Sequence, residues 1–136
     1  MRKLNKMDKK FFFISTIPCL LVGYFFKDCV LLNNSDMIAF VAIATGFLLS
    51  ALAILFSSPL RQVLYEKDEK GYESSWERIV IRYSYLFNYC TGFIVILLLN
   101  FEIPKWVLIT LLMHIVILIS FVANQLFMLL LREVND

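Results

Sequence analysis

The sequence predicts an all-α membrane protein with four transmembrane helices. Of the 136 residues, 60% are hydrophobic and 18% are charged, whereas a soluble domain has about 45–50% apolar residues. Uncharged runs recur at lengths near the roughly 20 residues that a helix needs to cross a bilayer. Charged or turn-forming residues separate these runs. We expect two antiparallel helical hairpins in one membrane domain, 1–136, with approximate spans 11–32, 37–56, 79–101 and 105–131.

The first expected span follows a basic segment. Five Lys or Arg residues precede the uncharged run 11–26, a charge pattern shared with secretory signal peptides. No small-residue cleavage pattern follows Phe26, however, so we expect the segment to be retained in the membrane. The apolar residues up to Leu32 extend this span, and Pro18 is expected to kink it because proline removes one backbone hydrogen bond from a helix.

The second expected span contains a face of small residues. A turn-forming tetrad, 33–36, precedes the uncharged run 37–56. Five small residues recur at spacings of 3, 4, 4 and 3, which places them on one helix face: Ala39, Ala42, Gly46, Ser50 and Ala53. Such faces allow close packing between helices in lipid. We therefore expect this face to pack against another helix and to mediate oligomerisation.

Residues 58–78 are expected to form a short helical hairpin on the cytosolic side. Ser58 is typical of a helix N-cap before a proline in the first turn. Ser74 and Glu77 have the spacing of a capping box, which predicts a helix that begins near Ser75 and continues into the third span. An ordered hairpin could receive a signal or bind a cytosolic protein.

The third and fourth spans are joined by a very short connection, 103–105, which predicts an antiparallel pair. The last apolar run, 106–131, has 26 residues. It would be about 39 Å long as a helix, so we expect it to tilt or to protrude from the bilayer.

The distribution of basic residues predicts the orientation. Five Lys or Arg residues precede the first uncharged run, and five lie at positions 57–82, between the second uncharged run and the third. The connections on the other side have one each, Lys27 and Lys105, and the C-terminal tail has Arg132. The positive-inside rule then places both termini and the 58–78 hairpin in the cytoplasm, which we interpret as a multi-pass protein of the bacterial inner membrane.

Several function classes are disfavoured by composition and motifs. The net charge of +2 is too small to indicate nucleic-acid binding. The chain has one histidine and no phosphate loop or catalytic triad pattern, so we expect no enzyme, no cofactor and no metal. No carboxylate lies at the centre of a span, which argues against a proton-driven transporter. Cys19, Cys29 and Cys90 are expected to pack as small apolar residues, with a redox role for Cys29 as the alternative.

Two polar helix faces are candidates for a pore lining or for contacts between helices. One, in the fourth span, contains Thr110, His114 and Gln125, and the other, in the third span, contains Ser84, Asn88 and Thr91. Either face could line a water-filled path in an oligomer, where His114 would be a pH-sensitive or steric element. Either could equally supply hydrogen bonds between packed helices. Both interpretations stay open at this point.

Three charged residues lie where the cytosolic hairpin enters the third span. Arg82 has the position of a membrane-boundary anchor whose long side chain reaches the interface. The alternative is a cytosolic gate or partner contact formed by Glu77, Arg78 and Arg82 together. The sequence supports both hypotheses.

The segment 46–56, GFLLSALAILF, followed by a charged hairpin and a second helix pair, resembles small four-span membrane subunits of bacterial anti-phage defence systems such as Hailong and Kiwa. The resemblance covers the general plan. It implies a homo-oligomer, for example a tetramer, that forms or regulates an ion-conducting pore and is controlled by a cytosolic protein partner. No functional residue is transferred from it.

The leading hypothesis is therefore a channel-forming effector subunit that oligomerises through the small-residue face and depolarises the membrane when triggered. The alternative is a non-conducting binding protein, such as an immunity protein or a membrane anchor for a cytosolic partner. A small-molecule transporter is the third hypothesis.

Overall fold

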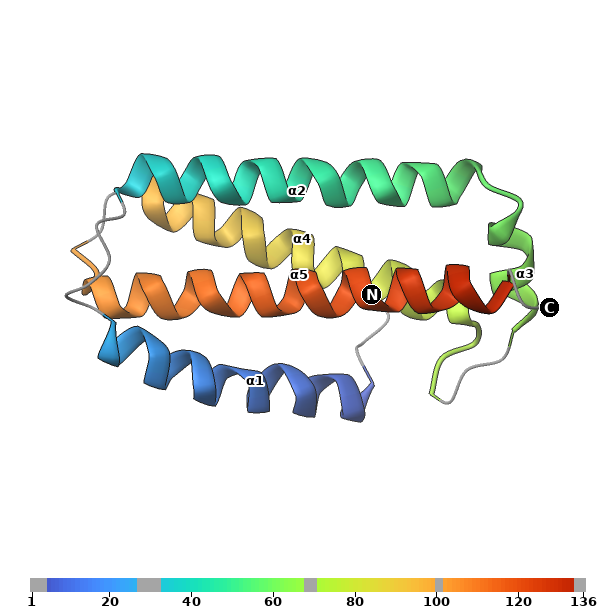
Figure 1. Cartoon of the computed structure of the whole chain (residues 1–136), viewed down its shortest axis with the longest axis horizontal. Helices are drawn as coiled ribbons and strands as arrows, with labels where there is room; N and C mark the ends of the chain where they lie inside the picture. The colour runs from blue at the N-terminus through green and yellow to red at the C-terminus, as the bar shows by residue number, and fades with distance from the viewer. Residues whose placement is uncertain (1–4, 27–32, 68–70, 100–101, 134–136) are drawn as a thin grey trace.

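The computed structural model shows an all-α protein, as the sequence predicts. It describes residues 5–26, 33–67, 71–99 and 102–133, with side chains described up to residue 128. Within these residues there are five helices: α1 (Lys6–Phe25), α2 (Asn34–Ser57), α3 (Leu60–Glu66), α4 (Ser75–Leu98) and α5 (Lys105–Glu133). The four long helices extend along the longest axis of the molecule, and α3 lies at one end (Figure 1).

Three of the long helices are long and apolar enough to cross a membrane. Within the described residues these are α2, α4 and the Lys105–Met128 part of α5, each with 24 residues. They coincide with the predicted second, third and fourth spans within a few residues. The predicted first span, 11–32, overlaps α1, which begins five residues earlier at Lys6, continues through Pro18 and ends at Phe25. The expected extension to Leu32 and the third cysteine, Cys29, fall outside the described residues.

The helix starts follow the predicted capping residues. The Glu77 backbone N–H donates to the Ser74 hydroxyl at 3.1 Å, and α4 begins at Ser75 and continues without a break into the apolar segment. Likewise, the Leu60 N–H donates to the Ser58 hydroxyl at 3.1 Å where α3 begins. The start of α4 is as predicted, whereas α3 begins one residue later than predicted, with Pro59 rather than Ser58 at the N-cap position.

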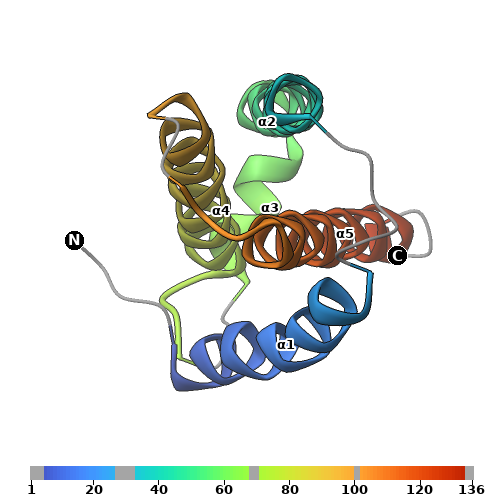
Figure 2. The same cartoon turned by 90° about the vertical axis from the view of Figure 1, so that its left-hand side faces the viewer.

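The pairing of the helices differs from the two separate hairpins that we expected. In the described residues, α1 packs mainly along α5 and α2 mainly along α4, while α4 also packs on α5. Figure 2 shows α1 and α2 on opposite sides of α5. The first two helices run in opposite directions but do not form a packed pair. The face of α1 that contains its small and polar residues packs on α5 instead.

The apolar core lies between α2, α4 and α5. Its most completely buried side chains include Val41, Leu86, Ile115 and Leu118. Cys19 and Cys90 are buried free thiols, as expected for cysteines that pack as small apolar residues. Outside this core, α1, α2 and α4 carry exposed apolar side chains along much of their length, whereas those of α5 lie near its ends.

Candidate functional site

A buried ion pair joins the start of α1 to α4. The Arg82 Nε–H donates to the Asp8 Oδ2 at 2.9 Å, and an Arg82 Nη2–H donates to Oδ1. The side chains are 7% and 8% exposed. A bidentate pair of this kind is stronger and geometrically more specific than a single contact. The two residues lie 74 positions apart in the chain, so the pair holds distant segments together.

The same carboxylate also holds the loop before α4. The Tyr72 hydroxyl donates to Asp8 Oδ2 at 2.5 Å, and the backbone N–H of Asn5 donates to the Tyr72 hydroxyl at 2.9 Å. On the other side, the Arg82 guanidinium lies 5.2 Å from the ring centroid of Phe121 on α5. The set Asp8, Tyr72 and Arg82, which we name the latch, therefore joins α1, the hairpin loop and α4 and contacts α5.

The electrostatics of the latch favour an ionised carboxylate. Burial raises the pKa of Asp8, but the hydrogen bonds donated by Arg82 and Tyr72, together with the positive charges of Arg82 and Arg78, outweigh that effect and hold the pKa of Asp8 below its usual value. A carboxylate with a lowered pKa in the folded state stabilises the fold above its unfolded pKa. The pair is thus charged at neutral pH, and its contribution is lost only as the pH falls through the lowered pKa.

Of the predicted cytosolic group, Arg82 is buried, whereas Glu77 and Arg78 are half-buried. Arg82 is buried in the latch rather than extended toward the interface as an anchor. The Glu77 carboxylate accepts from the backbone N–H of Glu73 at 2.7 Å, and Arg78 is half-buried nearby. Sequence reasoning missed Asp8, although an acidic residue within a basic segment before a span was a usable signal.

A second polar cluster surrounds His114, between α1, α4 and α5. Its Nε2 atom lies 3.0 Å from the Ser15 hydroxyl, and its Nδ1 atom lies 3.1 Å from the Tyr89 hydroxyl. The tautomer decides which group donates in each bond. His114 is 7% exposed, so both ring nitrogens are occupied by contacts inside one subunit.

Thr110 and Gln125, predicted on the same face as His114, are also directed into the subunit. Thr110 is buried, and its hydroxyl donates to the Trp106 carbonyl at 2.8 Å. Gln125 is half-buried beside a small void that Arg82 and Tyr83 also line. Two buried polar atoms have no hydrogen-bond partner in the described part of the chain, Arg82 Nη1 and the Tyr83 hydroxyl.

Replacing His114 tests whether these contacts stabilise the subunit. We expect His114→Leu to lower the free energy of unfolding in detergent by about 1 kcal/mol, because interhelical hydrogen bonds in membrane proteins have magnitudes near this value. Ser120→Leu provides a control, since Ser120 lies on the same helix but is exposed. Equal losses in the two variants, measured by thermal unfolding, would contradict a specific role for the histidine bonds.

The other predicted polar face points away from the core. Ser84, Asn88 and Thr91 are all exposed on the outer side of α4. A cavity of about 170 Å³ lies beside this face, lined in part by Asn88, Gly92 and Leu111. Because Asn88 lies near the middle of α4, its amide would face lipid in an isolated subunit within a bilayer.

The small-residue face of α2 is likewise unoccupied within the subunit. All five residues are exposed: Ala39, Ala42, Gly46, Ser50 and Ala53. A methyl group added at Gly46 would meet no atom within 4 Å. The close contact between helices occurs instead at Gly23 on α1, which packs against Thr110 and the Trp106 carbonyl of α5. Sequence reasoning missed the matching signal on α1, where Ser15, Cys19 and Gly23 recur at every fourth position.

An apolar groove of about 530 Å³ separates α2 from α5. Phe47 and Leu48 of α2 and Ile119 and Phe127 of α5 are among its lining residues. The described residues bring together no group of three or more histidine, cysteine or carboxylate side chains that could hold a metal ion. No protein-family model, curated protein or solved structure was found to match this chain.

Proposed function

We propose that the chain crosses the bacterial inner membrane four times, with both termini and the α3 hairpin in the cytoplasm. Support for α1 as the additional span comes from its outer side. Phe13 is 80% exposed, and the following turns carry further large exposed apolar side chains, namely Ile14, Ile17, Leu20, Leu21, Tyr24 and Phe25. Such a surface is stable in lipid and costly in water. The excess of Lys and Arg at the N-terminus and in the hairpin supports the orientation.

We further propose that the subunit assembles into a homo-oligomeric channel whose opening depolarises the membrane. The observation that carries this proposal is the exposed polar face of α4. An uncompensated amide in hydrocarbon is unfavourable, and polar residues in spans usually face a bundle interior or a water-filled path. In an oligomer, Ser84, Asn88 and Thr91 can face a shared axis. The exposed small-residue face of α2 offers a surface for close contact between subunits.

The proposed trigger acts through the hairpin. Its loop is tied to α1 and α4 by the latch, so a cytosolic protein bound there could change the packing of the spans. The proposed setting, bacterial anti-phage defence, is supported by the resemblance in general plan that the sequence shows. Native mass spectrometry measures the number of subunits in the proposed oligomer.

One observation favours a second candidate, a non-conducting binding protein. The side chain of His114 bonds to Ser15 of α1 and Tyr89 of α4 inside a single subunit, which supports a role in contacts between packed helices rather than in a lining. If Asn88 also bonds across a subunit interface, the oligomer has no water-filled path. Such a protein would serve as an immunity protein or as a membrane anchor for its cytosolic partner.

Conductance measurements separate the two candidates. We expect Asn88→Leu to reduce strongly the conductance of the reconstituted protein in planar bilayers, because it replaces a pore-facing amide by an apolar side chain. Asn124→Leu is the matched control, as Asn124 is exposed on α5, outside the two predicted polar faces. Unchanged conductance in Asn88→Leu would exclude the α4 face as the lining. Absence of conductance in the unmodified protein, also with its partner present, would favour the non-conducting protein.

A further inference from the structure

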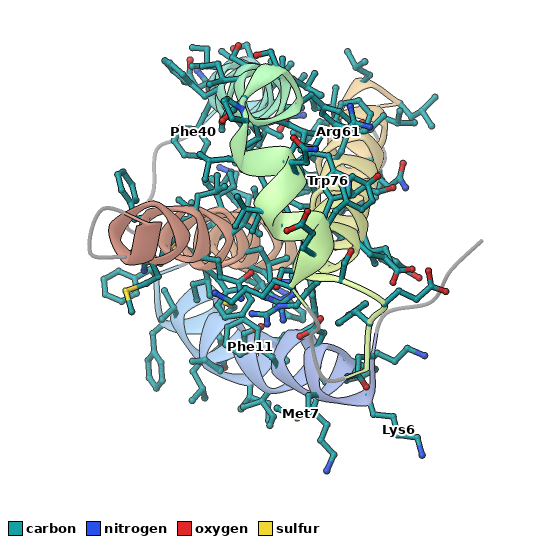
Figure 3. The ribbon with its side chains drawn as sticks, turned by 90° about the vertical axis from the view of Figure 1, so that its right-hand side faces the viewer. Lys6, Met7, Phe11, Phe40, Arg61 and Trp76 are labelled. Atoms are coloured by element: carbon teal, nitrogen blue, oxygen red, sulfur yellow. The ribbon has the colours of Figure 1, made fainter. Side chains whose placement is uncertain are left out.

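Arg61 of α3 is held against an aromatic cluster at one end of the bundle. Its guanidinium carbon lies 5.7 Å from the ring centroid of Phe56, 5.6 Å from that of Tyr65 and 5.7 Å from that of Trp76. Figure 3 shows Arg61 and Trp76 close together beside α3. Contacts of a guanidinium with aromatic faces at these distances are favourable and become stronger when the group is partly removed from water.

The aromatic cluster is anchored by one buried ring, that of Trp76, which the exposed rings of Phe56 and Tyr65 flank. Trp76 is 4% exposed. The ring of Phe56 meets it edge to face with centroids 4.8 Å apart, and the ring of Tyr65 lies 5.7 Å away. These rings come from α2, α3 and α4. A side chain that is already ordered loses less conformational entropy when it binds a ligand.

Within the described part of the chain, the charge of Arg61 has no carboxylate partner, whereas Arg82 is paired with Asp8. Arg61 is exposed, so its guanidinium remains accessible to a ligand beside the rings that it contacts. A planar guanidinium with free N–H groups is well suited to bidentate contact with a phosphate.

The cluster also lies where the apolar helices end. Phe56 is in the last turn of α2, and Trp76 is in the first turn of α4. Aromatic side chains gather at the boundary between hydrocarbon and headgroups, and this boundary is where lipid phosphates lie. The inner leaflet of a membrane, which contains anionic lipids, attracts basic residues near its surface.

We propose that Arg61, on its platform of Phe56, Tyr65 and Trp76, binds the phosphate of an anionic phospholipid. The acyl chains of this lipid would lie against the apolar outer surface of the spans. The site rests on the proposed membrane crossing of α2 and α4, and it is independent of ion conduction. A conductance experiment that fails would therefore leave this site untouched.

Fluorescence quenching of Trp76 provides a local readout. The chain has two tryptophans, so Trp106→Phe leaves Trp76 as the single emitter. The protein is reconstituted into phosphatidylcholine bilayers that contain nitroxide-labelled phosphatidylglycerol or, at the same mole fraction, nitroxide-labelled phosphatidylcholine. The ratio of the two relative affinities reports preference for the anionic headgroup near this position, because nitroxide quenching acts only over a short distance and therefore samples the lipids next to the cluster.

We expect a ratio of about five, since one basic side chain near the surface contributes about a fivefold preference for anionic lipid. Arg61→Gln should bring the ratio to about one. Lys67→Gln, which removes one positive charge from the end of the same hairpin helix, should leave it unchanged. If Arg61→Gln fails to fold, Arg61→Lys replaces it and should lower the ratio, because an ammonium makes no bidentate contact and stacks less well.

Four results would overturn the proposal. These are a ratio near one in the parent protein, an unchanged ratio in the Arg61 variant, an equal loss in Lys67→Gln, and removal of the preference by millimolar inorganic phosphate. The third result would indicate diffuse attraction between surface charges. The fourth would indicate a site for a soluble anion rather than for a lipid.

Discussion

Asp8→Ala should lower the free energy of unfolding by about 3–5 kcal/mol, because it leaves the Arg82 guanidinium buried without a counter-charge. The side chain of Arg82 is only 7% exposed, and the Tyr72 hydroxyl loses its acceptor in the same variant. The effect is measurable by thermal unfolding in detergent or by titration with a denaturing detergent. We expect α1 to separate from α4 first, since the latch is where the hairpin loop and α4 hold the start of α1.

Two further variants distinguish the latch from a general effect of charge removal. Asp36→Ala removes an exposed carboxylate from the first turn of α2 and should cost no more than about 1 kcal/mol. The double variant Asp8→Leu with Arg82→Met replaces the pair by apolar side chains and should recover most of the lost stability, because an apolar replacement of a buried pair is often neutral. A double variant less stable than Asp8→Ala would contradict this account.

Only one residue of the ion pair in the latch, Arg82, could be identified from the sequence. Arg82 is a candidate site residue because it is a cation at the entrance to an apolar run. Its position alone suggests a membrane-boundary anchor. Its partner, Asp8, lies 74 positions away, and no local spacing links the two. Only the packing of α1 on α5 and of α4 on α5 brings them together, so the ion pair depends on tertiary structure that periodicity does not contain.

Helix positions were predictable for local reasons, whereas helix pairing was not. Runs of apolar residues and the Ser74 cap determine where α4 begins, and these are properties of neighbouring residues. Pairing depends on which helix faces fit together in shape and in hydrogen-bonding groups. The small-residue face of α2 is the longer one, yet it is exposed in the subunit, while the shorter series Ser15, Cys19 and Gly23 on α1 is buried against α5. The polar partners of His114 reinforce this choice, since Ser15 belongs to the same series.

Gly23→Val should destabilise the subunit by about 1–3 kcal/mol, the usual cost of added methyl groups in a packed contact. A Cβ atom at position 23 would lie 2.7 Å from the Trp106 carbonyl oxygen and would overlap the Thr110 side chain. Thr110 can rotate, but the backbone of α5 cannot move without disturbing the histidine contacts one turn further along. We therefore expect the upper part of this range in a thermal unfolding measurement, with a weakened α1–α5 contact.

Gly46→Val provides the matched control and links stability to assembly. The same substitution at position 46 meets no atom within 4 Å inside the subunit, so unfolding of the subunit should change by less than about 0.5 kcal/mol. If α2 mediates assembly, Gly46→Val should instead shift the oligomer toward smaller species in native mass spectrometry, because a branched side chain prevents close approach of two helices. Gly23→Val should not reproduce that shift at matched fractions of folded protein. If the two substitutions lower the free energy of unfolding equally, the α1–α5 contact is not closer than the surroundings of Gly46. If the Gly46→Val oligomer keeps its size, the α2 face is excluded as the interface.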